Sequence, residues 1–224
     1  MVTMTDKTTV RTERVTATRE AILTAAERLF AEYGVFAVSN RQVSEAAGQG
    51  NNAAVGYHFG TKADLVRAII RKHTERVERL RARMVARTGE STDVRDWVAC
   101  LIRPQTEHLA ALGSPTWFGR FAAQVMTDPV LRQVMAEESL GQPALMRTIE
   151  GFQRSLPNLP PEVRAERGDM ARQLMVHMVA ERERALAEDT PTPRATWHDA
   201  ATGLIDALTG LWLAPVTGGP ASAQ

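Results

Sequence analysis

Apolar residues recur at helical spacing along most of this chain, and that spacing limits its fold more than any other feature. The first clear stretch spaces its apolar side chains three or four positions apart, at Ile22, Ala25, Ala26, Leu29 and Phe30. Such spacing places them on one face of an α-helix. Later stretches repeat the pattern, and we find no alternation of apolar and polar residues of the kind that marks a half-buried strand. The sequence therefore predicts an all-α fold with about nine helices.

Length and composition permit a packed core and exclude some classes of protein. The chain has 224 residues, of which 44% are hydrophobic, enough for one large domain or for a small domain joined to a medium one. Its apolar runs fall well short of the roughly 18 residues that cross a membrane, so we expect no membrane segment. A single cysteine, Cys100, can form no internal disulfide, which favours a cytoplasmic location.

Residues that start and stop helices divide the N-terminal part into one longer helix, two short ones and a long fourth. Ser39 and Gln42 have the spacing of a capping box before the second helix. Thr61 caps a fourth helix that runs to about Arg87. Three glycines end the first three helices: Gly34, Gly48 and Gly60.

Two short helices joined by a tight turn, after a longer helix, are the outline of a helix-turn-helix unit. The residues from 19 to 59 read REAILTAAERLFAEYGV…SNRQVSEAAG…NNAAVGYHF, and GTKADL follows directly. This string resembles the TetR family of transcriptional regulators over about residues 16–76, in both order and spacing. The resemblance implies a three-helix DNA-binding domain at the N-terminus, followed by a C-terminal helical bundle that dimerises and binds a small effector.

The resemblance also implies which residues meet double-stranded operator DNA, because the third helix of the family lies in the major groove. Arg41 would contact a guanine edge or a phosphate, and Lys62, at the start of the fourth helix, a phosphate. His58 has an alternative role as a link between helices. The turn before the third helix is one residue longer than is usual, so either Asn51 or Asn52 can cap that helix. The expected DNA contacts are Arg41, Asn52, Ala53, Gly56, Tyr57, His58 and Lys62.

Charge is distributed unevenly along the chain. Residues 61–88 carry nine basic and three acidic side chains, whereas residues 89–224 carry twelve basic and seventeen acidic ones. The N-terminal part can therefore approach a polyanion more readily than the remainder. A solvated helix face is the alternative explanation of the basic stretch.

The C-terminal helices carry the expected dimer and effector sites. By the resemblance, Glu162–Glu188 and Trp197–Leu213 pair with the same helices of a second copy. Small residues on the last helix, such as Gly203 and Gly210, would allow close packing, although a monomeric bundle can also use them. The expected effector contacts are Trp97, Trp117, Phe121, Met175 and His177. Ordinary core packing is the alternative for the apolar ones, and a neighbouring hydrogen-bond partner is the alternative for His177.

These interpretations predict a flexible arm over residues 1–15, a DNA-binding domain over 16–76, a ligand-binding and dimerisation domain over 77–214 and a disordered tail over 215–224. We find no nucleophile elbow or phosphate loop, and His177 with Glu181 provides only two metal ligands. We therefore expect no enzyme, metal site or cofactor. The predicted function is a repressor that binds a palindromic operator as a homodimer and is released by a small apolar effector. The alternatives are an activator or a DNA-binding protein without an effector.

Overall fold

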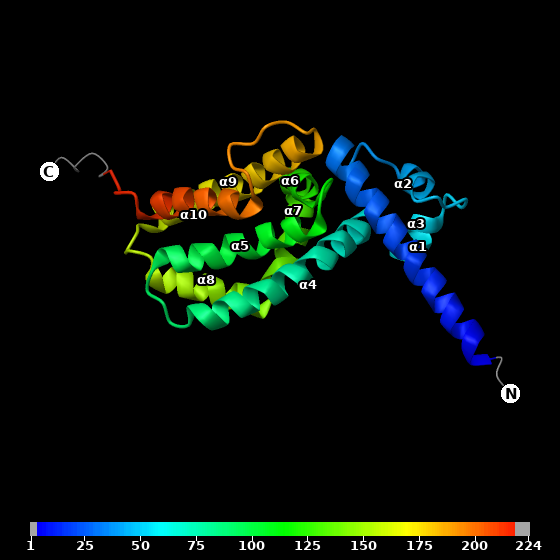
Figure 1. The fold of residues 1–224 in the computed structure, drawn as a ribbon, viewed down its shortest axis with the longest axis horizontal. Helices are drawn as coiled ribbons and strands as arrows, with labels where there is room; N and C mark the ends of the chain where they lie inside the picture. Colours follow the sequence, from blue (N-terminus) through cyan, green and yellow to red (C-terminus); the bar gives the residue numbers. More distant parts are fainter. Residues whose placement is uncertain (1–3, 218–224) are drawn as a thin grey trace. The chain divides into compact units, whose positions relative to one another are not determined.

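The computed structural model describes residues 4–217, and Figure 1 shows that its regular elements are helices. This confirms the all-α prediction. Within the same residues, no helix combines the length and the apolar character that a membrane span requires. The ten helices of the described part are α1 (Met4–Tyr33), α2 (Asn40–Ala46), α3 (Ala54–Phe59), α4 (Lys62–Thr88), α5 (Val94–Leu112), α6 (Phe118–Thr127), α7 (Pro129–Leu140), α8 (Pro143–Ser155), α9 (Pro161–Ala187) and α10 (Trp197–Leu213).

Helix α1 begins at Met4, which corrects the prediction of a flexible arm over residues 1–15 and of a helix from about Thr18. The apolar stripe marks only the part of α1 that is buried, from Ile22 onward. The preceding residues contain no glycine or proline to interrupt the helix, and threonine is a weak but tolerated helix former. Residues 12–17 are exposed, so this part of the helix leaves no signal in the apolar pattern. Residues 1–3 of the predicted arm lie outside the described residues.

The chain forms two compact units whose division differs from the predicted boundary at residue 76. The first unit contains the residues up to Thr74 together with Pro115–Ser139, and the second contains Glu75–Ser114 and the residues from Leu140 onward. Helices α6 and α7 thus pack with the N-terminal helices. Apolar packing accounts for this arrangement, because the ring of Phe121 in α6 is fully buried and stacks on that of Phe30 in α1, with 6.4 Å between the ring centres.

Helix caps in the first unit set where α2 and α4 begin. The Ser39 hydroxyl accepts from the Gln42 amide at 3.2 Å, and the Gln42 side chain accepts from the Ser39 amide at 2.8 Å. The predicted capping box is therefore confirmed. Thr61 and Asp64 exchange similar bonds at the start of α4, as the Thr61 cap requires. Local hydrogen bonds therefore fix the starts of the two helices that flank α3 in the sequence.

The second unit has its own apolar core, built by α5, α8, α9 and α10 and the later part of α4. Trp97 lies at its centre with 2% of its surface exposed, and Gly151 of α8 leaves room for the indole ring. Arg167 of α9 donates to the carbonyl oxygens of Trp212 and Ala214, which holds the end of α10. The predicted disordered tail covers residues 215–224. Residues 215–217 have no regular secondary structure, and residues 218–224 lie outside the described residues.

Candidate nucleic-acid interface

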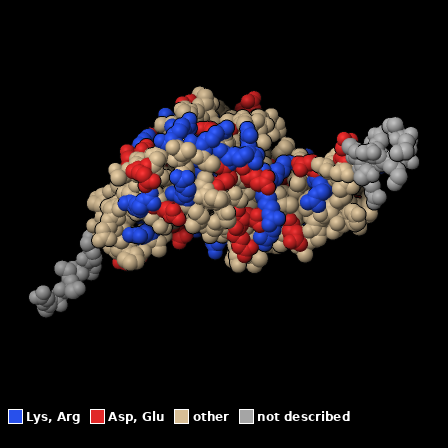
Figure 2. Space-filling view, turned by 90° about the horizontal axis from the view of Figure 1, so that it is seen from below, with Lys and Arg blue, Asp and Glu red and all other residues tan. Residues whose placement is uncertain are grey.

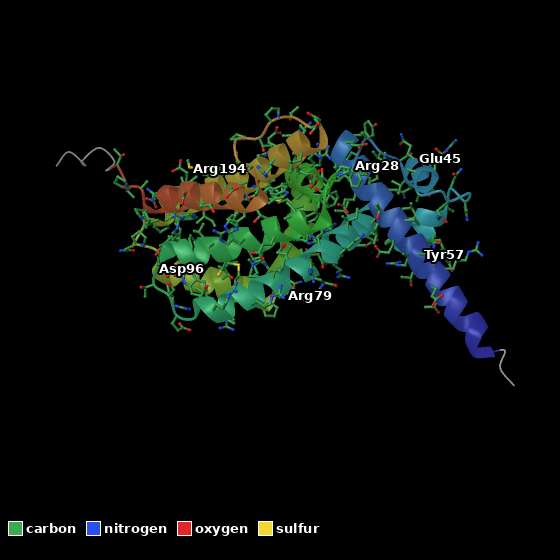
Figure 3. All side chains as sticks on the ribbon, viewed as in Figure 1. Arg28, Glu45, Tyr57, Arg79, Asp96 and Arg194 are labelled. Atoms are coloured by element: carbon green, nitrogen blue, oxygen red, sulfur yellow. The ribbon has the colours of Figure 1, made fainter. Side chains whose placement is uncertain are left out.

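Helices α2 and α3 each bury one face and leave the other open. Val43 and Ser44 point into the first unit from α2, and Ala54 and Val55 do so from α3. Figure 3 labels Glu45 and Tyr57, one exposed residue on each of these helices. Tyr57 has 82% of its surface exposed, so it contributes little to the core. The predicted contact residues on this open side are Arg41, Asn52, Ala53, Gly56 and Tyr57, all of them exposed.

Neither of the two candidate caps, Asn51 and Asn52, is the N-terminal cap residue of α3. The Asn51 side-chain oxygen accepts from the Ala53 amide at 2.9 Å. The N-terminal cap residue itself is Ala53, which has no side chain able to accept a hydrogen bond. Asn51 therefore serves the entrance of this helix, and the exposed Asn52 side chain is left for another role.

Arg19 of α1 holds the C-terminal end of α3, a contact that the sequence reading missed. Its guanidinium donates to the carbonyl oxygen of His58 and lies 4.3 Å from the ring centre of Phe59. A cation suits this position because the last carbonyls of a helix carry partial negative charge. One signal was available: Arg19 precedes Ile22 by three residues, so it shares the buried face of α1.

Two of the predicted contacts have bonding that bears on their proposed roles. The ammonium group of Lys62 donates to the carbonyl oxygens of Val35 and Val38, at 3.0 and 2.5 Å. Burial lowers the pKa of Lys62. In this structure Lys62 therefore joins the connection between α1 and α2 to the start of α4, and one of its three N–H donors is left for a phosphate. The half-buried ring of His58 lies edge-on to the ring of Tyr57, with 5.0 Å between centres.

The basic stretch over residues 61–88 does not form a uniform positive surface. Figure 2 shows Lys and Arg side chains interspersed with Asp and Glu on the face that it presents. Arg67 and Arg71 both pair with Glu138 of α7, at 2.9 and 2.6 Å, and Lys72 pairs with Glu20 of α1 at 2.9 Å. Part of the basic charge is thus neutralised by internal ion pairs.

The residues predicted to contact an effector are divided between the two units. Trp117 and Phe121 belong to the first, and Trp97, Met175 and His177 to the second. Trp97 and Phe121 are buried in separate apolar clusters. His177 is exposed, and its ring pairs with the Gln173 side chain at 3.1 Å. Neither unit by itself brings the predicted set together. Within residues 4–217, no three His, Cys, Asp or Glu side chains are placed to hold a metal ion.

The second unit has a largely apolar groove of about 510 Å³. Its walls are α9, the connection over residues 191–194 and α10. Met178 contributes from α9 with 54% of its surface exposed, and Gly203 and Ala207 contribute from α10. A groove lined by apolar side chains is a candidate binding site.

Two family descriptions match the chain. "Bacterial regulatory proteins, tetR family" matches residues 22–69, and "Tetracyclin repressor-like, C-terminal domain" matches residues 99–210. No curated protein matches the sequence. One similar crystal structure is a putative TetR-family transcriptional regulator from Mesorhizobium loti, with 16% identity, 90% of this chain and 97% of that chain covered, and a TM-score of 0.46. A second is PfmR from Thermus thermophilus, a TetR family transcriptional regulator, with 19% identity, 84% and 96% covered, and a TM-score of 0.48.

The two family matches together include α2, α3 and most of the helices of the second unit. The N-terminal match runs from Ile22 to Ile69, so it contains every residue predicted to contact DNA. The C-terminal match covers half of the chain. The all-helical structure agrees with both. This chain therefore belongs to the TetR family of bacterial transcriptional regulators, which bind DNA through an N-terminal helix-turn-helix.

Proposed function

We propose that this protein is a repressor that binds a palindromic operator as a homodimer and is released by a small apolar effector. Residues 16–76 are the proposed DNA-binding domain, and residues 77–214 the proposed ligand-binding and dimerisation domain. The observation that carries the proposal is the open face of α2 and α3, where Arg41 and Tyr57 are exposed on helices that are anchored from behind by Val43 and Val55.

The proposed DNA contacts divide by the part of the duplex that they reach. Asn52, Ala53, Gly56 and Tyr57 belong to α3 and its entrance, and small side chains at two of these positions allow the backbone to approach base edges. The remaining proposed contacts, at the edges of this face, are Arg41, His58 and Lys62.

A second copy is the proposed occupant of the groove between α9 and α10. Residues Glu162–Glu188 and Trp197–Leu213 form the proposed interface. The apolar side chains of Met178 and Leu213 are more than half exposed in the single chain. A Cβ atom added at Gly210 meets no other atom within 4 Å, so this face of α10 is open to a close neighbour. Two copies would present two copies of α3 to successive major grooves about 34 Å apart.

The proposed effector acts by binding one conformation better than another. It must prefer the dimer in which the two α3 helices no longer match the spacing of the major grooves. A coupling of about 1–3 kcal/mol would lower DNA affinity roughly 5- to 150-fold, and operator DNA would weaken effector binding by the same factor. The match to a tetracyclin repressor-like C-terminal domain supports this part of the proposal.

Selection from random duplexes tests the proposal directly. Wild-type protein should enrich one palindromic sequence, and sedimentation should show a dimer at micromolar concentration. Tyr57→Ala should weaken binding to that sequence by about 1–3 kcal/mol without loss of helix content. Failure of the wild-type protein to enrich any sequence would contradict the DNA-binding role. A small molecule that binds tightly but with equal affinity in the presence and absence of operator would not be the effector.

A further inference from the structure

The ion pair between Arg41 and Glu45 leaves a particular part of the arginine free. Glu45 accepts from Nε of Arg41 at 2.7 Å, one helical turn further along α2. The terminal nitrogens of Arg41 have no protein partner among the described residues. Both side chains are exposed, with 71% and 51% of their surfaces accessible. The bond to Glu45 thus occupies Nε and fixes the orientation of the guanidinium, whose two terminal nitrogens remain available to another partner.

That free end matches one edge of one base. Guanine presents two acceptors in the major groove, O6 and N7, and two parallel N–H groups of an arginine pair with them. A phosphate can accept a similar pair of hydrogen bonds, so the choice between the two partners depends on the direction in which this end of the guanidinium is held. Because Glu45 holds Nε, it restricts Arg41 to the end-on geometry that guanine accepts.

The charge of Glu45 acts in the same direction. A carboxylate on the DNA-facing side of α2 repels phosphates, and this repulsion lowers affinity for every sequence. Specificity for guanine is a difference between two affinities, so weakening the contact of Arg41 with phosphates increases it as much as strengthening the contact with guanine does. An exposed ion pair at this spacing adds little to the stability of a helix. Stabilising α2 would therefore be only a minor role for the pair of Arg41 and Glu45.

We propose that Glu45 is the positioning residue that makes Arg41 read a guanine in the operator instead of holding a phosphate. This inference rests on the proposed operator-binding function. Glu45 does not touch the base; it acts through Arg41, by fixing the direction of the guanidinium and by weakening contacts with the backbone of DNA.

The test begins with the sequence that wild-type protein selects from random duplexes. The base pair read by Arg41 is the position whose preference disappears in Arg41→Ala. Binding is then measured to duplexes that carry each of the four base pairs, or 7-deazaguanine, at that position. The variants are Glu45→Gln, Glu45→Ala and Arg41→Lys. Glu90→Ala, which breaks the exposed pair of Glu90 with Arg154 of α8, is the matched control.

Wild-type protein should prefer guanine at that position by about 5- to 150-fold and should lose part of this preference with 7-deazaguanine, which lacks N7. Glu45→Gln keeps an acceptor for Nε and should retain most of the preference. Glu45→Ala should lose most of it while binding unrelated duplexes more tightly. Arg41→Lys should lose it as well, since an ammonium group cannot pair with both acceptors in the same way. Glu90→Ala should behave as wild type.

Two results would overturn the inference while the proposed function stands. If Glu45→Ala kept the full preference for guanine, Glu45 would not position Arg41. If Arg41→Ala weakened binding to all sequences equally and flattened the salt dependence, Arg41 would be a phosphate contact. If wild-type protein selected no sequence at all, the proposed function itself would fail, and the two failures are thereby distinguished.

Discussion

Gly151 lies against the largest buried side chain of the second unit and allows a quantitative prediction. A Cβ atom added at this position would lie 2.4 Å from two carbon atoms of the Trp97 indole. Carbon atoms in favourable contact are about 3.5–4.0 Å apart, so Gly151→Ala creates an overlap of more than about 1 Å. Trp97 has little freedom to withdraw, because it is 2% exposed and its Nε1 donates to the Ser91 carbonyl at 2.9 Å.

Two effects of Gly151→Ala oppose each other, and their magnitudes decide the result. Overpacking a well-filled core costs about 1–3 kcal/mol, and the large overlap places this case toward the upper end. Alanine inside a helix gains roughly 0.5–1 kcal/mol over glycine. We therefore expect Gly151→Ala to lower the free energy of unfolding by about 1–2 kcal/mol. For a chain of this length, the midpoint of thermal unfolding should fall by about 2–8 °C.

Gly168 of α9 provides a matched control in thermal unfolding followed by circular dichroism. A Cβ atom there would lie 3.9 Å from the nearest atom of Trp212, which is an ordinary contact. Gly168→Ala should therefore gain the helix preference without a clash and raise the midpoint. Adding Trp97→Phe to Gly151→Ala should cost less than the sum of the two single changes, because the smaller ring relieves the overlap. If Gly151→Ala were as stable as Gly168→Ala, the steric reasoning would be refuted.

Three further predictions concern the first unit and the proposed dimer. Arg19→Met should weaken operator binding while the salt dependence stays as in wild type, because Arg19 bonds to α3 and not to a phosphate; a reduced salt dependence would identify a phosphate contact. Hydrogen bonds from Arg71 and Arg67 lower the pKa of Glu138, so its stabilisation is present above the ordinary glutamate pKa of about 4.3 and is lost as the pH falls through the lowered value. Glu138→Gln should therefore lower the thermal midpoint at neutral pH by more than it does in acid, and an equal loss at both would disprove this origin. Gly210→Trp should give monomers in sedimentation, because its side chain would hold two α10 helices apart; unchanged dimers would exclude α10 from the interface.

The local sequence determined which segments are helical and where most helices begin. The capping residues Ser39 and Thr61 act on backbone groups within three residues, so their effect can be recognised in the sequence. The final helix matches its predicted bounds, Trp197–Leu213, because Thr196 caps it and a segment rich in proline precedes it. The order and spacing of residues 16–76 were likewise enough to indicate the family and the face proposed to meet DNA.

Tertiary structure alone decided which helices pack together and which polar groups meet. Phe121 joins Phe30 across about ninety residues of sequence, so the place of α6 with the N-terminal helices has no local signal. Lys62 appears in the sequence as a cation at a helix start, yet two of its three N–H donors go to the Val35 and Val38 carbonyls. The physical reason is that a sequence pattern reveals only interactions between residues that are close together in the chain. Caps and helical spacing act within about one turn, whereas a buried ring or an ammonium group finds its partners only after distant segments have come together.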